Sequence, residues 1–118
     1  MAGDWLPVEF VTPDKPEIKT IAKQCHCSRG DAFLGWFRVY CHLQRLCDEH
    51  GRAEMVSPEE LDQVASLPGL GEVLQQVNWV LFDDNGASVM GWKRFNSKSA
   101  RVRIQTAERM KRMRTGDA

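Results

Sequence analysis

Residues 56–92 read VSPEELDQVASLPGLGEVLQQVNWVLFDDNGASVMGW, and the local signals in this stretch decide the fold. Ser57 is a strong helix N-cap, Pro58 suits the first helical position, and Glu60 is spaced to reach back to the cap. The sequence LPGLG interrupts the helical pattern, which resumes in residues 70–77 with apolar side chains at helical spacing. The stretch therefore predicts a helix, a tight turn and a short helix, which is the outline of a helix-turn-helix.

The end of the same stretch predicts a β-hairpin. Asn85 and Gly86 favour a type I′ turn, because both central positions of that turn take positive φ angles. With these two residues as the loop, Trp79 would face Trp92 at the base of the hairpin. The pairs between would be Asp84 with Ala87, Phe82 with Val89, and Leu81 with Met90. Facing tryptophans would stabilise the hairpin by roughly 0.2–1 kcal/mol.

A short strand and a helix are predicted at the start of the chain. Residues 4–11, DWLPVEFV, alternate enough for a strand, and Pro7 suggests an edge position. Residues 12–25, TPDKPEIKTIAKQC, predict a helix that opens with a capping box of Asp14 and Glu17. The apolar face of this helix would consist of Ile18, Ile21, Ala22 and Cys25.

A longer helix should follow, from a cap at Ser28 and Asp31 to a stop at Gly51. Its apolar positions recur at intervals of three and four residues, and most of them are aromatic. These positions are Phe33, Trp36, Phe37, Tyr40, Leu43 and Cys47. The spacing predicts that this face of the helix forms the spine of the hydrophobic core.

Charge is unevenly distributed along the chain. Residues 93–118 hold nine Lys and Arg but two acids, Glu108 and Asp117, so this segment carries about +7. Subtracting these from the 16 basic and 16 acidic residues of the whole chain leaves seven bases and fourteen acids in residues 1–92. The basic segment contains good helix formers and is expected to form a cationic helix attached to an acidic body.

The composition limits the class of protein. A chain of 118 residues and 13.5 kDa, with a mean hydropathy of −0.43, is expected to form one domain with an appendage. No apolar run approaches the roughly 18 residues that a membrane span needs. The N-terminus MAGDWLPVEF does not resemble a signal peptide. The sequence therefore predicts a cytoplasmic location with reduced cysteines.

Neither a metal site nor a catalytic site is predicted. Cys25 and Cys27 are too close together for a zinc half-site, and Cys41 and Cys47 are too far apart, although His50 lies near. No motif typical of hydrolases, phosphate-binding loops or metalloproteases is present. We therefore expect no enzyme activity, no cofactor and no metal.

Four segments resemble a known family: TPDKPEIKTIAKQC, SRGDAFLGWFRVY, VSPEELDQVASLPGLGEVLQQVNWV and RFNSKSARVRIQTAERMKRMR. They are similar to the N-terminal domain of phage and prophage replication-initiation (replisome-organiser) proteins. The resemblance implies a winged helix-turn-helix in residues 1–92, mainly α with a small β-hairpin wing, and a basic C-terminal helix in residues 93–118. Such proteins usually continue into a region that engages helicase-loading machinery, which implies a helicase-loading or replication partner. This chain stops at Ala118, as a stand-alone relative or a fragment.

The expected DNA-binding residues lie in two places. Those in the basic segment are Lys93, Arg94, Lys98, Arg101, Arg103, Arg109, Lys111, Arg112 and Arg114. Those in the predicted recognition helix are Gln75, Gln76 and Asn78, which could read base edges. Glu72 and the aspartates of the wing tip would repel phosphates, so the cations of the first helices could join the basic segment instead. These cations are Lys15, Lys19, Lys23 and Arg29.

The sequence thus predicts a protein that binds double-stranded DNA and acts in replication initiation of a phage or mobile element. A homodimer is possible, because the basic segment could also fold onto an acidic patch of the body or of a second copy. Two alternatives remain open: an adaptor that recruits a replication or regulatory protein, and an autoregulatory transcriptional repressor.

Overall fold

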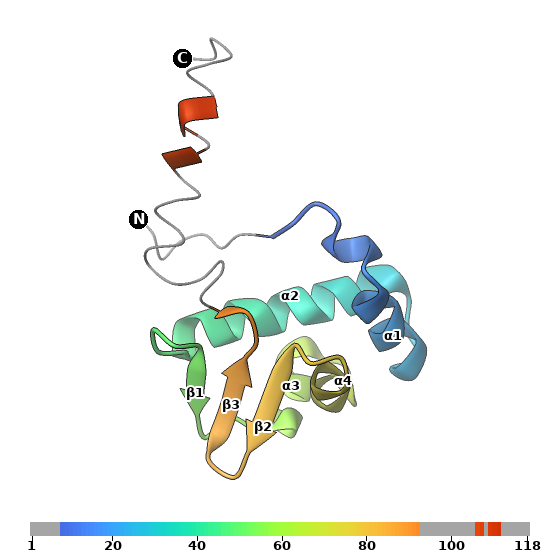
Figure 1. Ribbon diagram of the computed structural model, residues 1–118. Coiled ribbons are helices and arrows are strands. Elements are labelled where there is room, and N and C mark those ends of the chain that lie inside the picture. The colour runs from blue at the N-terminus through green and yellow to red at the C-terminus, as the bar shows by residue number, and fades with distance from the viewer. Residues whose placement is uncertain (1–7, 93–105, 108, 112–118) are drawn as a thin grey trace.

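The computed structural model describes residues 8–92, 106, 107 and 109–111, and the elements form a mainly helical α+β fold, as predicted. In chain order the elements are η2 (Thr12–Asp14), α1 (Pro16–Gln24), α2 (Arg29–Leu46), β1 (Arg52–Glu54), α3 (Pro58–Ala65), α4 (Leu70–Gln76), β2 (Val80–Asp83) and β3 (Gly86–Val89). The long helix α2 crosses the molecule, with α1 at one end and with α3, α4 and the strands along one side (Figure 1).

Two predicted helix starts are formed by serine caps. The Ser28 Oγ accepts a hydrogen bond from the Asp31 amide at 3.0 Å, and the Ser57 Oγ accepts one from the Glu60 amide at 3.3 Å. The Glu60 carboxylate was expected to reach back to the cap, but it contacts His42 Nε2 at 3.0 Å. Because α2 packs beside α3, His42 offers this carboxylate a partner, and the contact joins the two helices.

The start of α1 differs from the predicted capping box. The N-cap is Lys15, not Asp14, and it makes no side-chain cap hydrogen bond. Lys15 has φ −65° and ψ 146°, an extended conformation that suits a residue before a proline. Pro16 then occupies the first helical position, so the proline and not the acidic pair sets the start of this helix.

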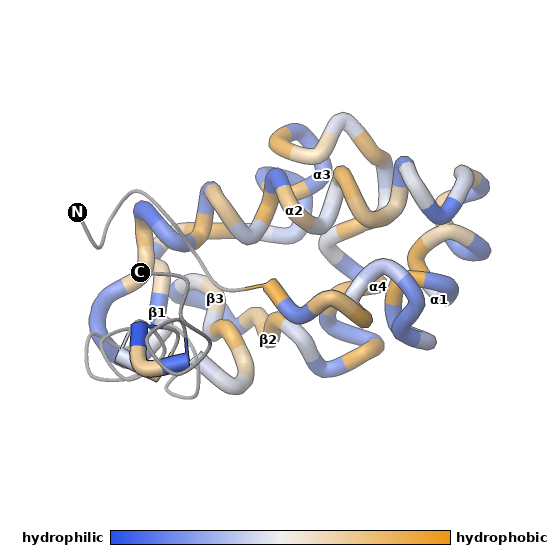
Figure 2. The backbone as a smooth tube through the Cα atoms, turned by 90° about the horizontal axis from the view of Figure 1, so that it is seen from above, coloured by the Kyte–Doolittle hydropathy of each residue, from blue (hydrophilic) through white to orange (hydrophobic). Residues whose placement is uncertain are grey.

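The buried face of α2 is not the aromatic face that the spacing predicted. The buried residues of α2 are Ala32, Gly35, Val39 and Leu43. A Cβ at Gly35 would lie 3.2 Å from Leu67 Cδ2, so the chain that follows α3 approaches α2 closely. Small side chains permit this approach, whereas aromatic rings would hold the segments apart. The hydropathy pattern along α2 is correspondingly mixed (Figure 2).

The aromatic side chains of α2 lie on its flank and are half-buried. Their ring centroids are 5.2 to 6.5 Å apart along a row made of Phe33, Trp36, Phe37 and Tyr40. Trp36 also meets Trp79 edge-on at 5.6 Å, which ties α2 to the loop before β2. The row therefore supports the core from one side.

The long helix ends earlier than predicted. Its last residue is Leu46, and Gly51 lies in the turn that follows. In this turn the Asp48 Oδ1 accepts hydrogen bonds from the amides of His50 at 2.8 Å and Arg52 at 3.1 Å. Gly51 has φ +80°, and a Cβ there would collide with Trp92, so this position requires glycine.

The helix-turn-helix forms as predicted, and a side chain of α3 closes its turn. The Asp62 carboxylate accepts hydrogen bonds from the Gly69 amide at 3.0 Å and from the Gly71 amide at 2.7 Å. Both amides belong to the start of α4, where helix amides lack backbone partners. The backbones of α3 and α4 also meet closely, because a Cβ at Gly71 would collide with the backbone of Pro58.

The sheet has three antiparallel strands in the order β1-β3-β2. Its first strand, β1, pairs Ala53 with Ala87 and was not predicted. The strand predicted at residues 4–11 is wrong for residues 8–11, which form a turn into η2, and residues 4–7 lie outside the described chain. The third strand of the sheet therefore precedes the helix-turn-helix directly.

The hairpin is present, but the predicted register is wrong by two residues. The observed pairs run from Val80 with Val89 to Asp83 with Gly86, and the two-residue loop is Asp84 and Asn85. Neither loop residue has a positive φ angle, so the type I′ turn is absent. Because a shift of two residues preserves the alternation of sides, the inward and outward faces are those that the pattern predicts.

The two tryptophans do not face each other across the hairpin. The Trp79 carbonyl accepts a hydrogen bond from the Met90 amide at 3.0 Å, and its ring packs on Trp36. Trp92 is buried, with 5% of its surface exposed, against the turn at Gly51.

Side-chain contacts explain this register. The Asp83 Oδ1 accepts hydrogen bonds from the amides of Asn85 at 2.8 Å and Gly86 at 3.0 Å, which closes the turn one residue earlier than predicted. Gly86 lies in β3, where a Cβ would collide with the Ala53 carbonyl oxygen. The glycine thus serves the contact with β1 and not the turn.

The described part of the C-terminal segment is helical at residues 106, 107 and 109–111, and the rest of the predicted basic helix lies outside the described residues. This turn lies on the far side of α2 from the sheet (Figure 1). In the part of the chain that the structure describes, no helix is both long and apolar enough to cross a membrane.

Candidate nucleic-acid interface

The predicted base-reading residues lie together at the end of α4, but one is already engaged. The Gln75 Oε1 accepts a hydrogen bond from the Phe82 amide at 3.0 Å, which joins α4 to β2. Gln76 is exposed, and Asn78 is exposed with a left-handed φ of +62° in the turn after the helix. Gln76 and Asn78 therefore present their amides to solvent, whereas Gln75 holds the hairpin.

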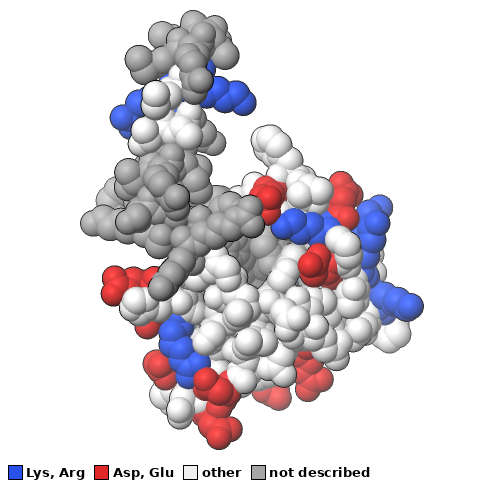
Figure 3. Space-filling model, viewed as in Figure 1, with Lys and Arg blue, Asp and Glu red and all other residues white. Residues whose placement is uncertain are grey.

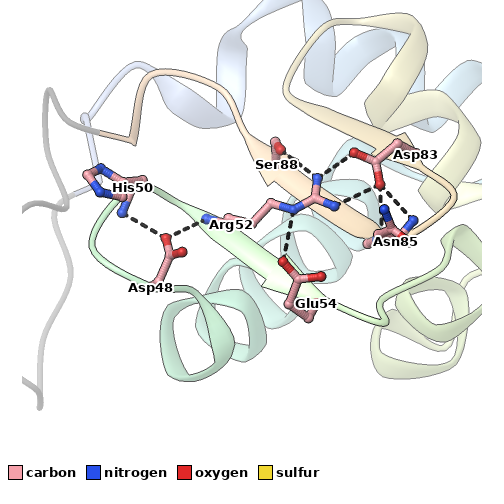
Figure 4. A network of polar contacts seen from close by, with 8 residues as sticks. Asp48, His50, Arg52, Glu54, Asp83, Asn85 and Ser88 are labelled. Atoms are coloured by element: carbon pink, nitrogen blue, oxygen red, sulfur yellow. Dashed lines mark hydrogen bonds and ion pairs between the residues drawn. The ribbon is translucent and has the colours of Figure 1, made fainter.

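The acidic wing tip is part of a network centred on Arg52. Its Nη1 and Nη2 atoms donate to Asp83 Oδ2 at 2.6 Å and Oδ1 at 2.7 Å (Figure 4). Further hydrogen bonds run from Nε to Glu54 Oε1 at 3.3 Å and from Nη1 to Ser88 Oγ at 3.1 Å. The hydrogen bond between Arg52 and Asp83 raises the pKa of the guanidinium and lowers the pKa of the carboxyl group. Arg52 is therefore occupied by its own sheet.

Arg52 is also the sole lysine or arginine between residues 46 and 92. The acids of this range are Asp48, Glu49, Glu54, Glu59, Glu60, Asp62, Glu72, Asp83 and Asp84. The helix-turn-helix and the hairpin thus carry a strong negative charge. In Figure 3, acidic atoms gather over the lower part of the molecule, where the strands and the hairpin tip lie.

Residues 8–45 have the opposite balance, with six bases and four acids. Lys15 pairs with Glu9 at 2.8 Å and lies 5.9 Å from the Trp79 ring centroid, and Arg29 contacts Asp14 at 3.4 Å. The remaining four cations are exposed and form no ion pair with the described residues. They are Lys19, Lys23, Arg38 and Arg45. These cations are available to a phosphate backbone.

Arg38 and Arg45 were not among the predicted DNA-binding residues. Both lie on the solvent-facing side of α2, seven residues apart, and therefore share one side of the helix. A signal for them existed, since the sequence of α2 contains no acid after Asp31.

The predicted contact residues of the basic segment are described in part. Arg109 and Lys111 are exposed on a helical turn beside Met110, which is 53% exposed. The others lie outside the described residues, namely Lys93, Arg94, Lys98, Arg101, Arg103, Arg112 and Arg114.

The cysteines are free thiols in half-buried positions. Burial, followed by the neighbouring Asp48 carboxylate, raises the pKa of Cys47 to about 11. Burial is also the largest cause of the raised pKa values of Cys25 and Cys27. Thiols with raised pKa values stay protonated near neutral pH and are weak nucleophiles and metal ligands. Among the described residues, no three His, Cys, Asp or Glu side chains are grouped to hold a metal ion.

No protein-family model matches the chain, and neither a curated protein nor a solved structure shows significant similarity to it. The function is therefore argued from the arrangement of charge on this fold.

Proposed function

We propose that this chain is a winged-helix DNA-binding protein that contacts the phosphate backbone with the basic segment 93–118 and the cations of α1 and α2. The proposed role is replication initiation in a phage or mobile element, and that role rests on the sequence resemblance. Location in the cytoplasm is part of the same proposal.

The order of elements supports the winged-helix assignment. From α2 onward the chain runs through one strand, a helix-turn-helix and a hairpin, and β1 completes the sheet beside β3. A hairpin that follows a helix-turn-helix directly is the arrangement expected of a wing. In this assignment α1 is an additional helix before the domain.

The observation that carries the proposal is the separation of charge. Docking through α4 and the hairpin tip would bring Glu72 and Asp84 to the phosphates, with Arg52 already bound to Asp83. Phosphate contacts are made by lysine and arginine, and each one releases counterions. The exposed cations of α1, α2 and the C-terminal segment meet this requirement, and the acidic side would repel DNA from the wrong orientation.

The test is a salt titration of duplex binding with two variants. The wild type should show a slope of log affinity against log salt of about −4 to −5. Changing Lys19, Lys23, Arg38 and Arg45 to Gln should flatten this slope by about three to four. The matched variant, Glu72→Gln with Asp84→Asn, should bind with an unchanged slope. Tighter binding by that matched variant would instead place α4 and the hairpin against DNA.

The adaptor function is the second candidate, and the nine acids between residues 46 and 92 are the observation that favours it. An adaptor would show almost no salt-dependent binding to duplex DNA. An autoregulatory repressor would bind DNA through the same cations, and a footprint on the DNA around the gene would identify it.

A further inference from the structure

One side of the sheet is uncovered. Inward residues such as Ala53, Val80 and Ala87 are buried, whereas the alternate residues point to solvent. We call this outward surface, with the adjoining hairpin tip and the exposed side of α4, the acidic sheet face. It comprises Glu54, Met55, Glu72, Leu81, Asp83 and Asp84.

Glu72 adjoins the strands because α4 is held against β2. The hydrogen bond from the Phe82 amide to Gln75 Oε1 fixes the last turn of α4 beside this strand. Glu72 precedes Gln75 by three residues and therefore lies on the same side of the helix.

The acidic sheet face combines carboxylates with exposed apolar side chains. Met55 is 90% exposed and Leu81 is 39% exposed. Arg52, the one base at this surface within residues 46–92, is bound to Asp83 and Glu54. The face therefore lacks a free cation of its own and suits an occupant that has positive charge on one side and apolar side chains on the other.

We propose that the acidic sheet face binds the basic segment 93–118 of a second copy of this chain. At helical spacing, the cationic side of that segment holds Lys98, Arg101, Arg109 and Arg112, and the other side holds Ala100, Ile104, Ala107, Met110 and Met113. The described turn presents Arg109 and Met110 to solvent, so both kinds of side chain are available for contact.

The geometry favours a second copy over the same molecule. The described turn of the segment lies across α2 from the sheet, on the opposite side of the body (Figure 1). A contact between the segment of one copy and the sheet face of the next is heterologous, so it leaves one free segment and one free face at the ends. Self-association and DNA binding would compete for the same cations.

The test uses the full chain without DNA, so it is independent of the proposed DNA binding. Sedimentation velocity at low salt should show concentration-dependent association that weakens as salt rises, because the Debye length shortens. A face variant, Glu54→Gln, Glu72→Gln and Asp84→Asn, should weaken association roughly tenfold or more. A segment variant, Arg101→Gln, Arg109→Gln and Arg112→Gln, should weaken it similarly.

Mixing the two variants distinguishes this arrangement from a symmetric dimer. The face variant keeps its segment and the segment variant keeps its face, so the mixture should form a one-to-one complex that neither variant forms alone. The matched control removes three charges from helices, by Glu17→Gln, Asp31→Asn and Glu59→Gln, and should associate as the wild type does.

Three results would overturn the proposal. They are association that persists in the face variant, a mixture that stays monomeric, and a wild type that is monomeric at low salt.

Discussion

Arg52 on β1 reaches across β3 and holds both carboxylate oxygens of Asp83 on β2, a residue 31 positions away in the sequence. The same carboxylate closes the hairpin turn through two backbone amides. One pair of side chains thus links the two outer strands and sets where the hairpin turns.

The Arg52–Asp83 pair makes stability depend on acid pH. The hydrogen bond from Arg52 and then the Asn85 amide hold the pKa of Asp83 below its usual range. A lowered carboxyl pKa stabilises the fold above the unfolded-state pKa of about 4, and this stabilisation is lost as pH falls further. The melting temperature of Asp83→Asn should therefore lie below that of the wild type at pH 7, and the gap should narrow toward pH 3. A gap that is independent of pH would contradict this account.

Asp62 should be the most important acid of α3. Asp62→Ala removes the acceptor of two amides at the start of α4 and should lower the free energy of unfolding by about 0.5–2 kcal/mol. Glu59→Ala, in the same acidic cluster, is the control and should change it by less than about 0.5 kcal/mol. Urea denaturation of both variants measures the difference. Equal effects would mean that the acids act only through the helix dipole.

Gly71 should tolerate no side chain. Gly71→Ala places a methyl group against the Pro58 backbone and should destabilise the fold by about 1–3 kcal/mol. Gly30→Ala is the matched control, because the nearest atom to its Cβ would be Ser28 Oγ at 3.8 Å and the position is helical. That control should be neutral or stabilising by up to about 1 kcal/mol. Thermal unfolding followed by circular dichroism compares the two.

Trp92 should contribute more to stability than Trp79. Trp92 is the more buried of the two, so Trp92→Ala should cost about 3–5 kcal/mol. Its Nε1 atom is buried without a hydrogen-bond partner among the described residues. Trp92→Phe removes that donor and should therefore recover at least half of the loss. Chemical denaturation of Trp92→Ala, Trp92→Phe and Trp79→Ala tests the order, and a larger loss for Trp79→Ala would reverse it.

Local signals predicted those parts of the fold that depend on neighbours in the sequence. The caps at Ser28 and Ser57, the break between α3 and α4, and the presence of a hairpin are all formed. Each depends on residues within about four positions of one another, which is the range of capping and turn chemistry.

Contacts between distant segments decided the remainder. The strand β1 has three residues, which is too short for a period to be detected in sequence. Asp83 and the Gly86–Ala53 contact moved the hairpin turn, and the close approach of Leu67 to Gly35 turned the aromatic face of α2 to its flank. In the candidate site, the count of charges was predictable, whereas the occupation of Arg52 and Gln75 depends on tertiary neighbours.

The strand order also has a consequence for the kinetics of folding. β1 pairs with β3, so its docking closes a loop that contains residues 55–85, whereas the hairpin and the helix-turn-helix close over short distances. Short loops close first, and β1 is therefore expected to join after the rate-limiting step. Ala53→Gly should speed unfolding and leave the folding rate nearly unchanged, with a φ-value near zero in stopped-flow measurements. A φ-value near one would instead place β1 in the folding nucleus.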